Sequence, residues 1–280
     1  MSNKTTPTLS LATDYSIPGE FRHLQGELGE FISPLITTER VSRFKELAAL
    51  RSRKVMAIFE NTNHPHNVSA VLRSIDAFGF QDISFLYERE VVSSRIRDSV
   101  ERGTSNWLCV KRSYNLNSCA KTLQDAGYLI CLVSLPTFAR TAEHFIDQLP
   151  SFAIQDAGSL DFQKFFNGKK IALIFGNEKH GVAERWNNFA DCYLYVGMCG
   201  FVESLNVSVC AGILFQGLRQ YLVAKNSIET ATENEQKILL EYWLSRSLDL
   251  GNRIILNRRP DLLPYYDFVK GGRFFDPFPM

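Results

Sequence analysis

Short apolar runs that alternate with helical patterns constrain the fold of this chain more than any other feature. Each run has four or five residues rich in Val, Ile, Leu, Phe and Tyr, as buried strands do; the runs cover 55–59, 83–86, 129–133, 171–175 and 193–196. Helical patterns cover 67–78, 116–126 and 206–222. Strands alternating with helices predict an α/β fold with a mainly parallel sheet and helices on both faces. Ligands of such sheets bind beyond the carboxyl ends of the strands.

The regions on either side of this pattern differ in character. Residues 1–38 contain several Pro and Gly residues and no sustained period, so we expect a loosely structured arm there, and then a helix from Thr38. A charged amphipathic helix is expected over 229–248, and a tail after it. The sequence thus predicts an N-terminal arm and helix over 1–53, a core domain over 54–222, and a C-terminal helical extension and tail over 223–280.

The charge of the chain gives no simple indication of a nucleic-acid partner. The formal net charge is only +1, whereas RNA-binding proteins usually carry an excess of Lys and Arg. Two stretches are nevertheless basic: Arg40, Arg43, Lys45, Arg51, Arg53 and Lys54 in the first, and Arg89, Arg95, Arg97, Arg102, Lys111 and Arg112 in the second. If these stretches form RNA-contacting surfaces, their side chains, including Arg51 and Arg53, should contact phosphates; ordinary solvated helix faces are the alternative.

Apolar runs and cysteines bear on the compartment. The longest apolar stretch, 205–218, contains Asn206, Ser208 and Gln216 and is too short to span a bilayer, so we expect no membrane segment. The N-terminus lacks a signal pattern, which predicts a cytoplasmic protein. None of the six cysteines forms a C-x-x-C pair, and most lie in apolar runs. We therefore expect reduced thiols rather than disulfides or a zinc site.

The first polar motif follows the run at 55–59 and opens a helix. Its apolar stripe consists of Val68, Val71, Leu72, Ile75 and Phe78, and Arg73 lies on the opposite face. Asn67 is placed to cap the first turn or to serve a site. Arg73 either pairs with Asp76 three residues later or acts on a ligand. His64 and His66 resemble a metal pair but have no obvious third ligand, so no metal is expected.

The second motif, 176–181, follows the run at 171–175. Its two glycines lie five positions apart, as in a phosphate-binding loop, but Val182 and Ala183 occupy the positions where that loop needs Lys and Ser or Thr. A nucleoside triphosphate is therefore not indicated. Gly176 would let a backbone approach a ligand closely, and Glu178 would place a carboxylate at the same edge; a turn with a solvated acid is the alternative.

The third motif, 197–212, follows the run at 193–196. The helix that it opens is apolar nearly all round and contains small residues, so we expect it in the core or at a subunit interface. Ser204, Asn206 and Ser208, if buried there, need hydrogen-bond partners and are either capping groups or ligand contacts.

Together and in this order, the three motifs resemble the signatures of the SpoU/TrmH branch of the SPOUT RNA methyltransferases. Those signatures read H-N-(x)5-R-(x)4-F-G, F-G-N-E-x-x-G and M-x-G-x-x-x-S-L-N-V-S. The resemblance extends from about Glu39 to Tyr221, and the segment 204–209 is its most specific part. The segment 103–111 is most similar to the subgroup that acts on guanosine 18 of tRNA. One departure is Gly197, where the family often has proline.

The resemblance implies methyl transfer from S-adenosyl-L-methionine to a ribose 2′-oxygen of RNA, with guanosine 18 in the D-loop of tRNA as the expected target. It implies a SPOUT fold with a deep C-terminal trefoil knot and a homodimer, with the helix 205–221 at the interface, and it requires no metal. The implied cofactor-binding residues, which act mainly through backbone groups, are Val133, Gly176, Val196, Met198 and Leu205. The implied catalytic-site residues are Asn67, Arg73, Glu178, Ser204 and Asn206.

Three alternatives compete with this interpretation. Ribosomal RNA is the nearest, since the motifs are shared across the branch; a dedicated RNA-binding domain before the core would favour it, and only about 53 residues precede the first strand here. A non-catalytic RNA-binding protein of the same fold would not need Asn67, Arg73, Glu178 and Asn206 intact. A generic doubly wound nucleotide-binding enzyme would need a phosphate-binding fingerprint, which we do not find.

Overall fold

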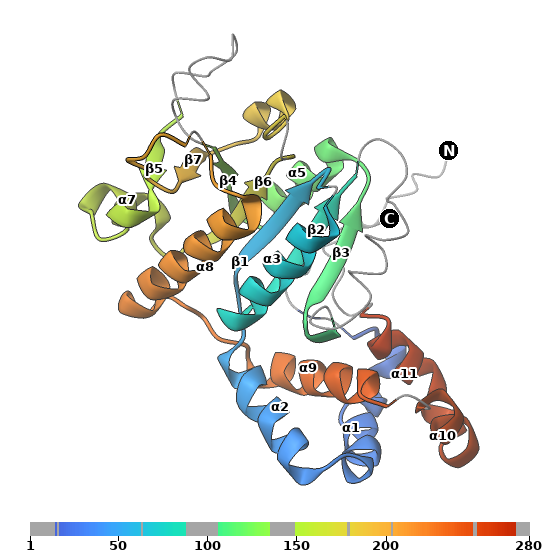
Figure 1. The fold of residues 1–280 in the computed structure, drawn as a ribbon. Coiled ribbons are helices and arrows are strands. Elements are labelled where there is room, and N and C mark those ends of the chain that lie inside the picture. Colours follow the sequence, from blue (N-terminus) through green and yellow to red (C-terminus); the bar gives the residue numbers. More distant parts are fainter. Residues whose placement is uncertain are drawn as a thin grey trace, which may run out of the picture.

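Seven parallel strands form the centre of the computed structural model, which describes residue 15 and residues 17–62, 64–87, 106–134, 149–177, 180–202, 204–248 and 251–272. The strands are β1 (Ser52–Glu60), β2 (Phe80–Leu86), β3 (Cys109–Ser113), β4 (Tyr128–Val133), β5 (Ser151–Ala153), β6 (Lys170–Phe175) and β7 (Cys192–Tyr195). Their order in the sheet is β3-β2-β1-β6-β4-β7-β5 (Figure 1). Every ladder between these described strands is parallel, which confirms the predicted α/β class.

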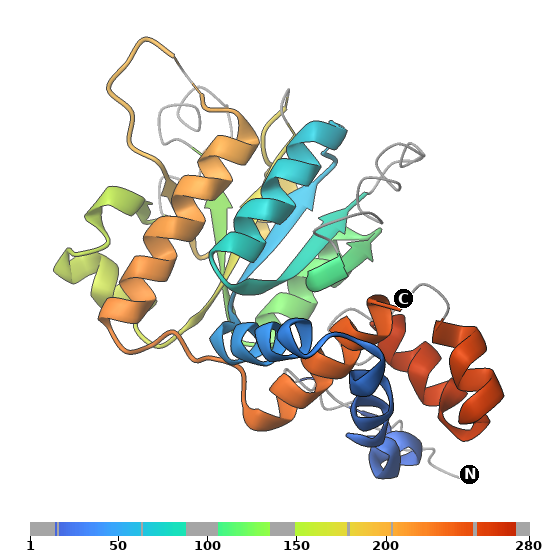
Figure 2. The same ribbon diagram turned by 60° about the horizontal axis from the view of Figure 1, so that its bottom comes forward.

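Helices cover both faces of this sheet. On one face, α3 (Pro65–Ala77) and α8 (Val207–Ala224) lie side by side, as both ribbon views show (Figures 1 and 2). On the other face lie α5 (Leu116–Asp125) and the 3-10 turn η5 (Glu184–Asn188). Successive residues of β1 point to opposite faces. Phe59 packs in the core under α3 and α8, and Ile58 packs in the core under α5 and η5. The central strands are therefore apolar throughout their length, as the sequence predicted.

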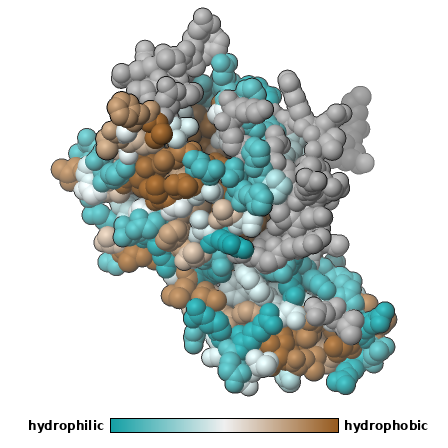
Figure 3. Space-filling view, viewed as in Figure 1, coloured by the Kyte–Doolittle hydropathy of each residue, from teal (hydrophilic) through white to brown (hydrophobic). Residues whose placement is uncertain are grey.

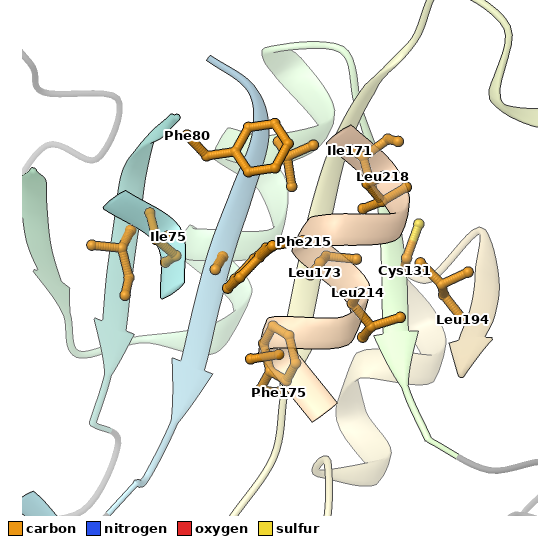
Figure 4. Close-up of a cluster of buried hydrophobic side chains, with 14 of the residues drawn as sticks. Ile75, Phe80, Cys131, Ile171, Leu173, Phe175, Leu194, Leu214, Phe215 and Leu218 are labelled. Atoms are coloured by element: carbon orange, nitrogen blue, oxygen red, sulfur yellow. The ribbon is translucent and has the colours of Figure 1, made fainter. Parts of the chain in front are cut away.

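The core under α8 is well filled. Leu214, Phe215 and Leu218 of α8 lie over Leu173 and Phe175 of β6 (Figure 4). Burying each of these side chains contributes roughly 1.5–3 kcal/mol to stability. These contacts fix α8, the helix that the third motif opens, onto β6, the strand that precedes the second motif.

Segments from both ends of the chain build a helical unit with its own core. It contains α1 (Glu27–Ile32), α2 (Thr38–Leu50), α9 (Glu233–Arg246), α10 (Gly251–Arg258) and α11 (Leu263–Lys270), with the 3-10 turns η1 (Gly19–Leu24), η2 (Ser33–Leu35) and η6 (Pro260–Leu262). Leu28, Trp243 and Tyr265 are almost completely buried in it. Figures 1 and 2 place this unit beside the amino ends of the strands, with α2 running directly into β1.

The expectation of a loosely structured arm over 1–38 is wrong for 19–35, which forms η1, α1 and η2. No local side chain caps α1; instead, Oε1 of Glu241 in α9 accepts hydrogen bonds from the backbone N–H groups of Gly26 (2.9 Å) and Gly29 (3.1 Å). The tail expected after 248 likewise contains α10 and α11. Long-range partners order both segments, so local pattern did not reveal them.

Two sheet-edge strands also escaped prediction. β3 carries Lys111 and Arg112 in the middle of its five residues, and β5 has only three residues. Among the described strands, each of the two pairs with one neighbour only, and the edge of a sheet is where strands tolerate charge and short length.

Helix α8 is the one described helix that is long and apolar enough to cross a membrane by length and composition. Here its inner face is part of the domain core, with Ala211, Leu214 and Leu222 buried. All six cysteines are free, as expected; Cys131 and Cys192, neighbours on β4 and β7, have their sulfur atoms 3.4 Å apart.

Candidate active site

Three neighbouring strands end beside one another and carry three of the predicted cofactor-contacting residues. In the sheet, β4 lies between β6 and β7. Val133 ends β4, Gly176 follows β6, and Val196 follows β7. Because all three strands are parallel, these residues lie at the same carboxyl edge, where parallel sheets bind ligands.

The loop after β6 folds back tightly on itself. Asn177 and Gly181 exchange two backbone hydrogen bonds, each 2.9 Å long, and Gly181 has a positive φ of 67°. A Cβ on Gly176 would lie 2.0 Å from the carbonyl carbon of Gly181, so only glycine fits there. The close backbone approach predicted for Gly176 is therefore made to its own loop.

Two side chains tie this loop to the end of β1. The amide of Asn177 donates a 2.7 Å hydrogen bond to the carbonyl oxygen of Asn61, the residue after β1. Glu60, the last residue of β1, accepts a 3.0 Å hydrogen bond from the backbone N–H of Ala183. Burial raises the pKa of the Glu60 carboxyl, and the bond from Ala183 opposes that shift. The first and second motifs thus meet at this edge.

Sequence reasoning did not single out Glu60 as a site residue. Its signal was a carboxylate directly after a run of apolar strand residues, at a position that proved only 2% exposed. A buried carboxylate needs a hydrogen-bond partner, and Glu60 finds one in the second motif.

The first and third motifs meet through two asparagines. Nδ2 of Asn206 donates to Oδ1 of Asn67, with 3.1 Å between the atoms. Oδ1 of Asn206 accepts from the backbone N–H (2.9 Å) and the hydroxyl (2.6 Å) of Ser208, which makes Asn206 the N-cap of α8. One side chain therefore begins α8 and fixes it to the start of α3.

Arg73 lies on the exposed face of α3. No ion pair joins Arg73 to Asp76, whose carboxylate instead accepts a hydrogen bond from Arg51. Among the described residues, Arg73 forms no ion pair or hydrogen bond. Its guanidinium is available to a ligand on the exposed face of α3.

The other predicted site residues are placed as follows. Leu205 and Met198 are half-buried, and Ser204 is exposed. Ser204 and Asn206 are thus not buried as the third motif suggested; Asn206 is a capping residue, and Ser204 faces solvent. Glu178 lies outside the described residues. Within the described ranges, no group of three or more His, Cys, Asp or Glu side chains could hold a metal ion.

The first basic stretch divides into two halves with different roles. Arg40, Arg43 and Lys45 are exposed on α2, whereas Arg51 and Lys54 are each only 3% exposed. Arg53 binds Asp82 of β2 (2.8 Å) and Glu235 of α9 (3.3 Å), and Lys54 pairs with Glu229. The expectation that Arg51 and Arg53 contact phosphates is therefore wrong: they join the helical unit to the sheet. Residues 89–102 of the second stretch lie outside the described residues.

The fold and the site define an α/β protein with a candidate ligand-binding site at the carboxyl edge of its parallel sheet. Comparison with known proteins then defines the family. Residues 54–216 match the SpoU rRNA Methylase family. That match covers more than half of the chain, which therefore belongs to this family.

Individual relatives agree with this assignment. The tRNA (guanosine(18)-2′-O)-methyltransferase of Thermus thermophilus is 29% identical over 213 residues, which are 75% of this chain and 98% of that protein. The enzyme of the same name from Escherichia coli K12 is 27% identical over 210 residues, or 72% and 81%. The crystal structure of the A. aeolicus TrmH/SpoU tRNA modifying enzyme has a TM-score of 0.57 at 21% identity, covering 75% of this chain and 97% of that one, and shows the same fold.

Proposed function

We propose that this protein transfers a methyl group from S-adenosyl-L-methionine to the ribose 2′-oxygen of guanosine 18 in tRNA, in the cytoplasm. The observation that carries the proposal is the meeting of the three motifs at one sheet edge, through the Asn206–Asn67 and Asn177–Asn61 hydrogen bonds. Family membership supports methyl transfer to RNA. The names of the relatives support the 2′-oxygen of guanosine 18 in tRNA as the acceptor.

The residues at the edge suit this cofactor, which would bring an electrophilic methyl carbon attached to sulfur. S-adenosyl-L-methionine has an apolar adenosine face and no phosphates, so it needs backbone partners and apolar walls rather than a phosphate loop. Val133, Val196 and Leu205 offer only backbone polar groups and apolar side chains, and Val133 and Leu205 remain partly accessible. The second motif lacks the Lys and Ser or Thr of a phosphate loop, which fits the same ligand.

Arg73 would act on the hydroxyl that receives the methyl group. A guanidinium keeps its proton at physiological pH, so Arg73 would donate hydrogen bonds rather than remove a proton. As the bond between oxygen and methyl carbon forms, the bond between methyl carbon and sulfur would break, and the hydroxyl proton would pass to solvent water. Its charge would stabilise the oxygen as negative charge develops and could hold the adjacent phosphate at the same time. Asn67 and Asn206 would hold α3, and hence Arg73, in register with the cofactor loops; Glu178 and Ser204 complete the proposed set.

Exposed cations of the helical unit would add affinity for tRNA. Arg43 and Lys45 lie on the open face of α2, where Arg43 has only an exposed 3.4 Å contact with Glu46. An exposed pair of this kind contributes less than about 1 kcal/mol, so phosphates can displace it. The unit lies beside the amino ends of the strands (Figure 1), so only an extended RNA would touch both regions.

We also propose that two copies associate through α8. Apolar side chains remain open on its outer face: Val209 and Val223 are about half exposed, and Ile213 is 37% exposed. Figure 3 shows a hydrophobic area on this side of the molecule, interrupted by polar residues. A patch of this kind usually marks an interface. Light scattering should give twice the chain mass of 31.9 kDa; a monomer at micromolar concentration would contradict this.

The deep trefoil knot is a further part of the proposal. Strand order puts β6 and β7 on opposite sides of β4, so the chain crosses β4 between the second and third motifs. A crossing at that point supports the knotted path that the resemblance implies.

Ribosomal RNA is the second candidate substrate, favoured by the family's description. The test gives purified protein and labelled S-adenosyl-L-methionine to unmodified tRNA and, separately, to protein-free ribosomal RNA, alongside a calorimetric titration of the cofactor. We expect cofactor binding and label in tRNA. Label in ribosomal RNA alone would reassign the substrate, and absence of cofactor binding would indicate a non-catalytic RNA-binding protein.

A further inference from the structure

A glutamine side chain holds the start of the third-motif loop. Nε2 of Gln155 donates to the carbonyl oxygen of Gly197 (3.0 Å), and the N–H of Gly197 donates to Oε1 of Gln155 (2.9 Å). Both backbone polar groups of one residue, Gly197, are thus paired with both polar groups of one side-chain amide. Gln155 lies in the 3-10 turn η4 (Ile154–Asp156), and Gly197 adjoins Val196 and Met198, two proposed cofactor contacts.

The register of the sheet explains this pairing. β5 and β7 are parallel, with Ala153 opposite Tyr195. Continuing that register by two residues would place Gln155 opposite Gly197. The backbone leaves the sheet at η4, however, and the Gln155 side chain makes the hydrogen bonds that a strand would make there. The Gln155 side chain thus adds one more hydrogen-bonded pair to the ladder between β5 and β7, at the residue where the third-motif loop, here also called the cofactor loop, begins.

The turn that carries Gln155 is itself firmly held. Ile154 is only 5% exposed and packs against Gly217 of α8, where a Cβ would lie 2.4 Å from Cγ1 of Ile154. One short turn therefore contacts the residue that begins the loop and the helix that follows it. The distance between Gly197 and α8 is fixed by two successive residues, Ile154 and Gln155.

Packing does not force Gln155 into this position. The residue is exposed and borders an open cavity of about 550 Å³ between η4 and α8, so its side chain has room to turn away. Gly197 is also exposed and has no side chain to restrain it. The two hydrogen bonds are therefore the main local restraint on the loop at this residue.

We propose that Gln155 is a positioning residue for the cofactor loop, which it holds in the binding conformation before the ligand arrives. This inference rests on the proposed function, because it takes the backbone on either side of Gly197 to contact S-adenosyl-L-methionine. Ordering a loop in advance strengthens binding, because the ligand no longer has to order it.

The test compares Gln155→Ala with Gln163→Ala by calorimetry with S-adenosyl-L-methionine. Gln163 borders the same cavity and hydrogen-bonds the carbonyl oxygen of Gly158, but does not contact the loop. We expect Gln155→Ala to raise the dissociation constant about fivefold to tenfold, in line with the loss of two hydrogen bonds. The control should leave it unchanged. Gln155→Glu, which can accept a hydrogen bond from Gly197 but cannot donate one to it, should also raise the dissociation constant.

Kinetics separate positioning from a general structural role. In steady-state assays, Gln155→Ala should raise KM for the cofactor while leaving KM for tRNA and the melting temperature near the wild-type values. A dissociation constant and a cofactor KM for Gln155→Ala equal to those of the wild type would overturn the inference. An equal fall in cofactor and tRNA binding, together with a lowered melting temperature, would overturn it too. Failure of the wild type to bind the cofactor would instead refute the proposed function.

Discussion

Asn206 and Asn67 lie 139 positions apart in the sequence and are joined by a side-chain hydrogen bond of 3.1 Å. Through this bond, the residue that caps α8 also contacts the first turn of α3, the helix that carries Arg73. The position of Arg73 relative to the third-motif loop thus depends on a residue that also has a local capping role.

These two roles of Asn206 can be separated by substitution. Serine is a good N-cap but is too short to reach Asn67, so Asn206→Ser should keep the stability of α8 and lose the link. We expect single-turnover methyl transfer to fall about tenfold to a hundredfold, with little change in the unfolding free energy. Asn206→Ala should lose the cap as well, at a cost of about 1 kcal/mol. Wild-type transfer by Asn206→Ser would show that the link is not needed.

Arg73→Ala should abolish most methyl transfer while leaving the fold and cofactor affinity intact. The side chain is exposed and supports no described neighbour, so its loss costs little stability. Removing charge stabilisation of the developing alkoxide should slow the reaction about a hundredfold to a thousandfold. Arg73→Lys distinguishes a simple charge, which lysine restores in part, from a planar two-point grip, which it does not. Single-turnover rates beside a cofactor titration measure both effects.

Charge reversal on α2 should weaken tRNA binding. With Arg43→Glu and Lys45→Glu combined, tRNA affinity should fall, and the dependence of log K on log salt should become shallower by about one to two units. Cofactor affinity and the melting temperature serve as controls and should not change. Unaltered tRNA affinity over a range of salt concentrations would mean that α2 is only a solvated surface.

The pH dependence of stability should reveal the buried carboxyl of Glu241. Burial raises its pKa, although hydrogen bonds from Tyr265, Gly29 and Gly26 oppose the shift. The folded state therefore holds the carboxyl proton of Glu241 more tightly than the unfolded chain does, where a glutamate has a pKa of about 4.3. Relative to Glu241→Gln, the wild type should be most stable below that pH, lose stability as the pH rises through the folded-state pKa, and level off above it. Paired urea titrations at several pH values measure this difference; one that is constant from pH 3.5 to 8 would contradict the shift.

Local pattern predicted the parts of the fold that depend on neighbouring residues. The runs at 55–59 and 171–175 became β1 and β6 because central parallel strands are apolar on both faces. Helix α1 was missed because its N-terminal partner, Glu241, is more than 200 positions away. The ion pair between Arg53 and Glu235 was missed for the same reason, because its partners lie far apart in the sequence. From the sequence alone, Arg53 resembled the exposed basic residues near it.

The site divides along the same line. Motif spacing singled out Asn67 and Asn206, which the structure joins by a hydrogen bond, and Arg73, whose role stays a prediction. Glu60 opens the first motif but is not one of its signature residues, and Gln155 lies outside all three motifs. Both act through hydrogen bonds to loops that the sheet brings near them, so spacing gave no sign of them. Parallel pairing of β5 with β7 is the information that was needed for Gln155, and three residues are too few to predict that strand.

The central claim is methylation of one ribose in tRNA, and mapping the modified nucleotide tests it most directly. Purified protein is incubated with an unmodified tRNA transcript and S-adenosyl-L-methionine, and 2′-O-methylated positions are then located by their resistance to alkaline cleavage, with Arg73→Ala as the matched control. We predict a single new resistant position at guanosine 18 with the wild type and none with the variant. Resistance at another nucleotide, at no nucleotide, or equally with Arg73→Ala would contradict the account.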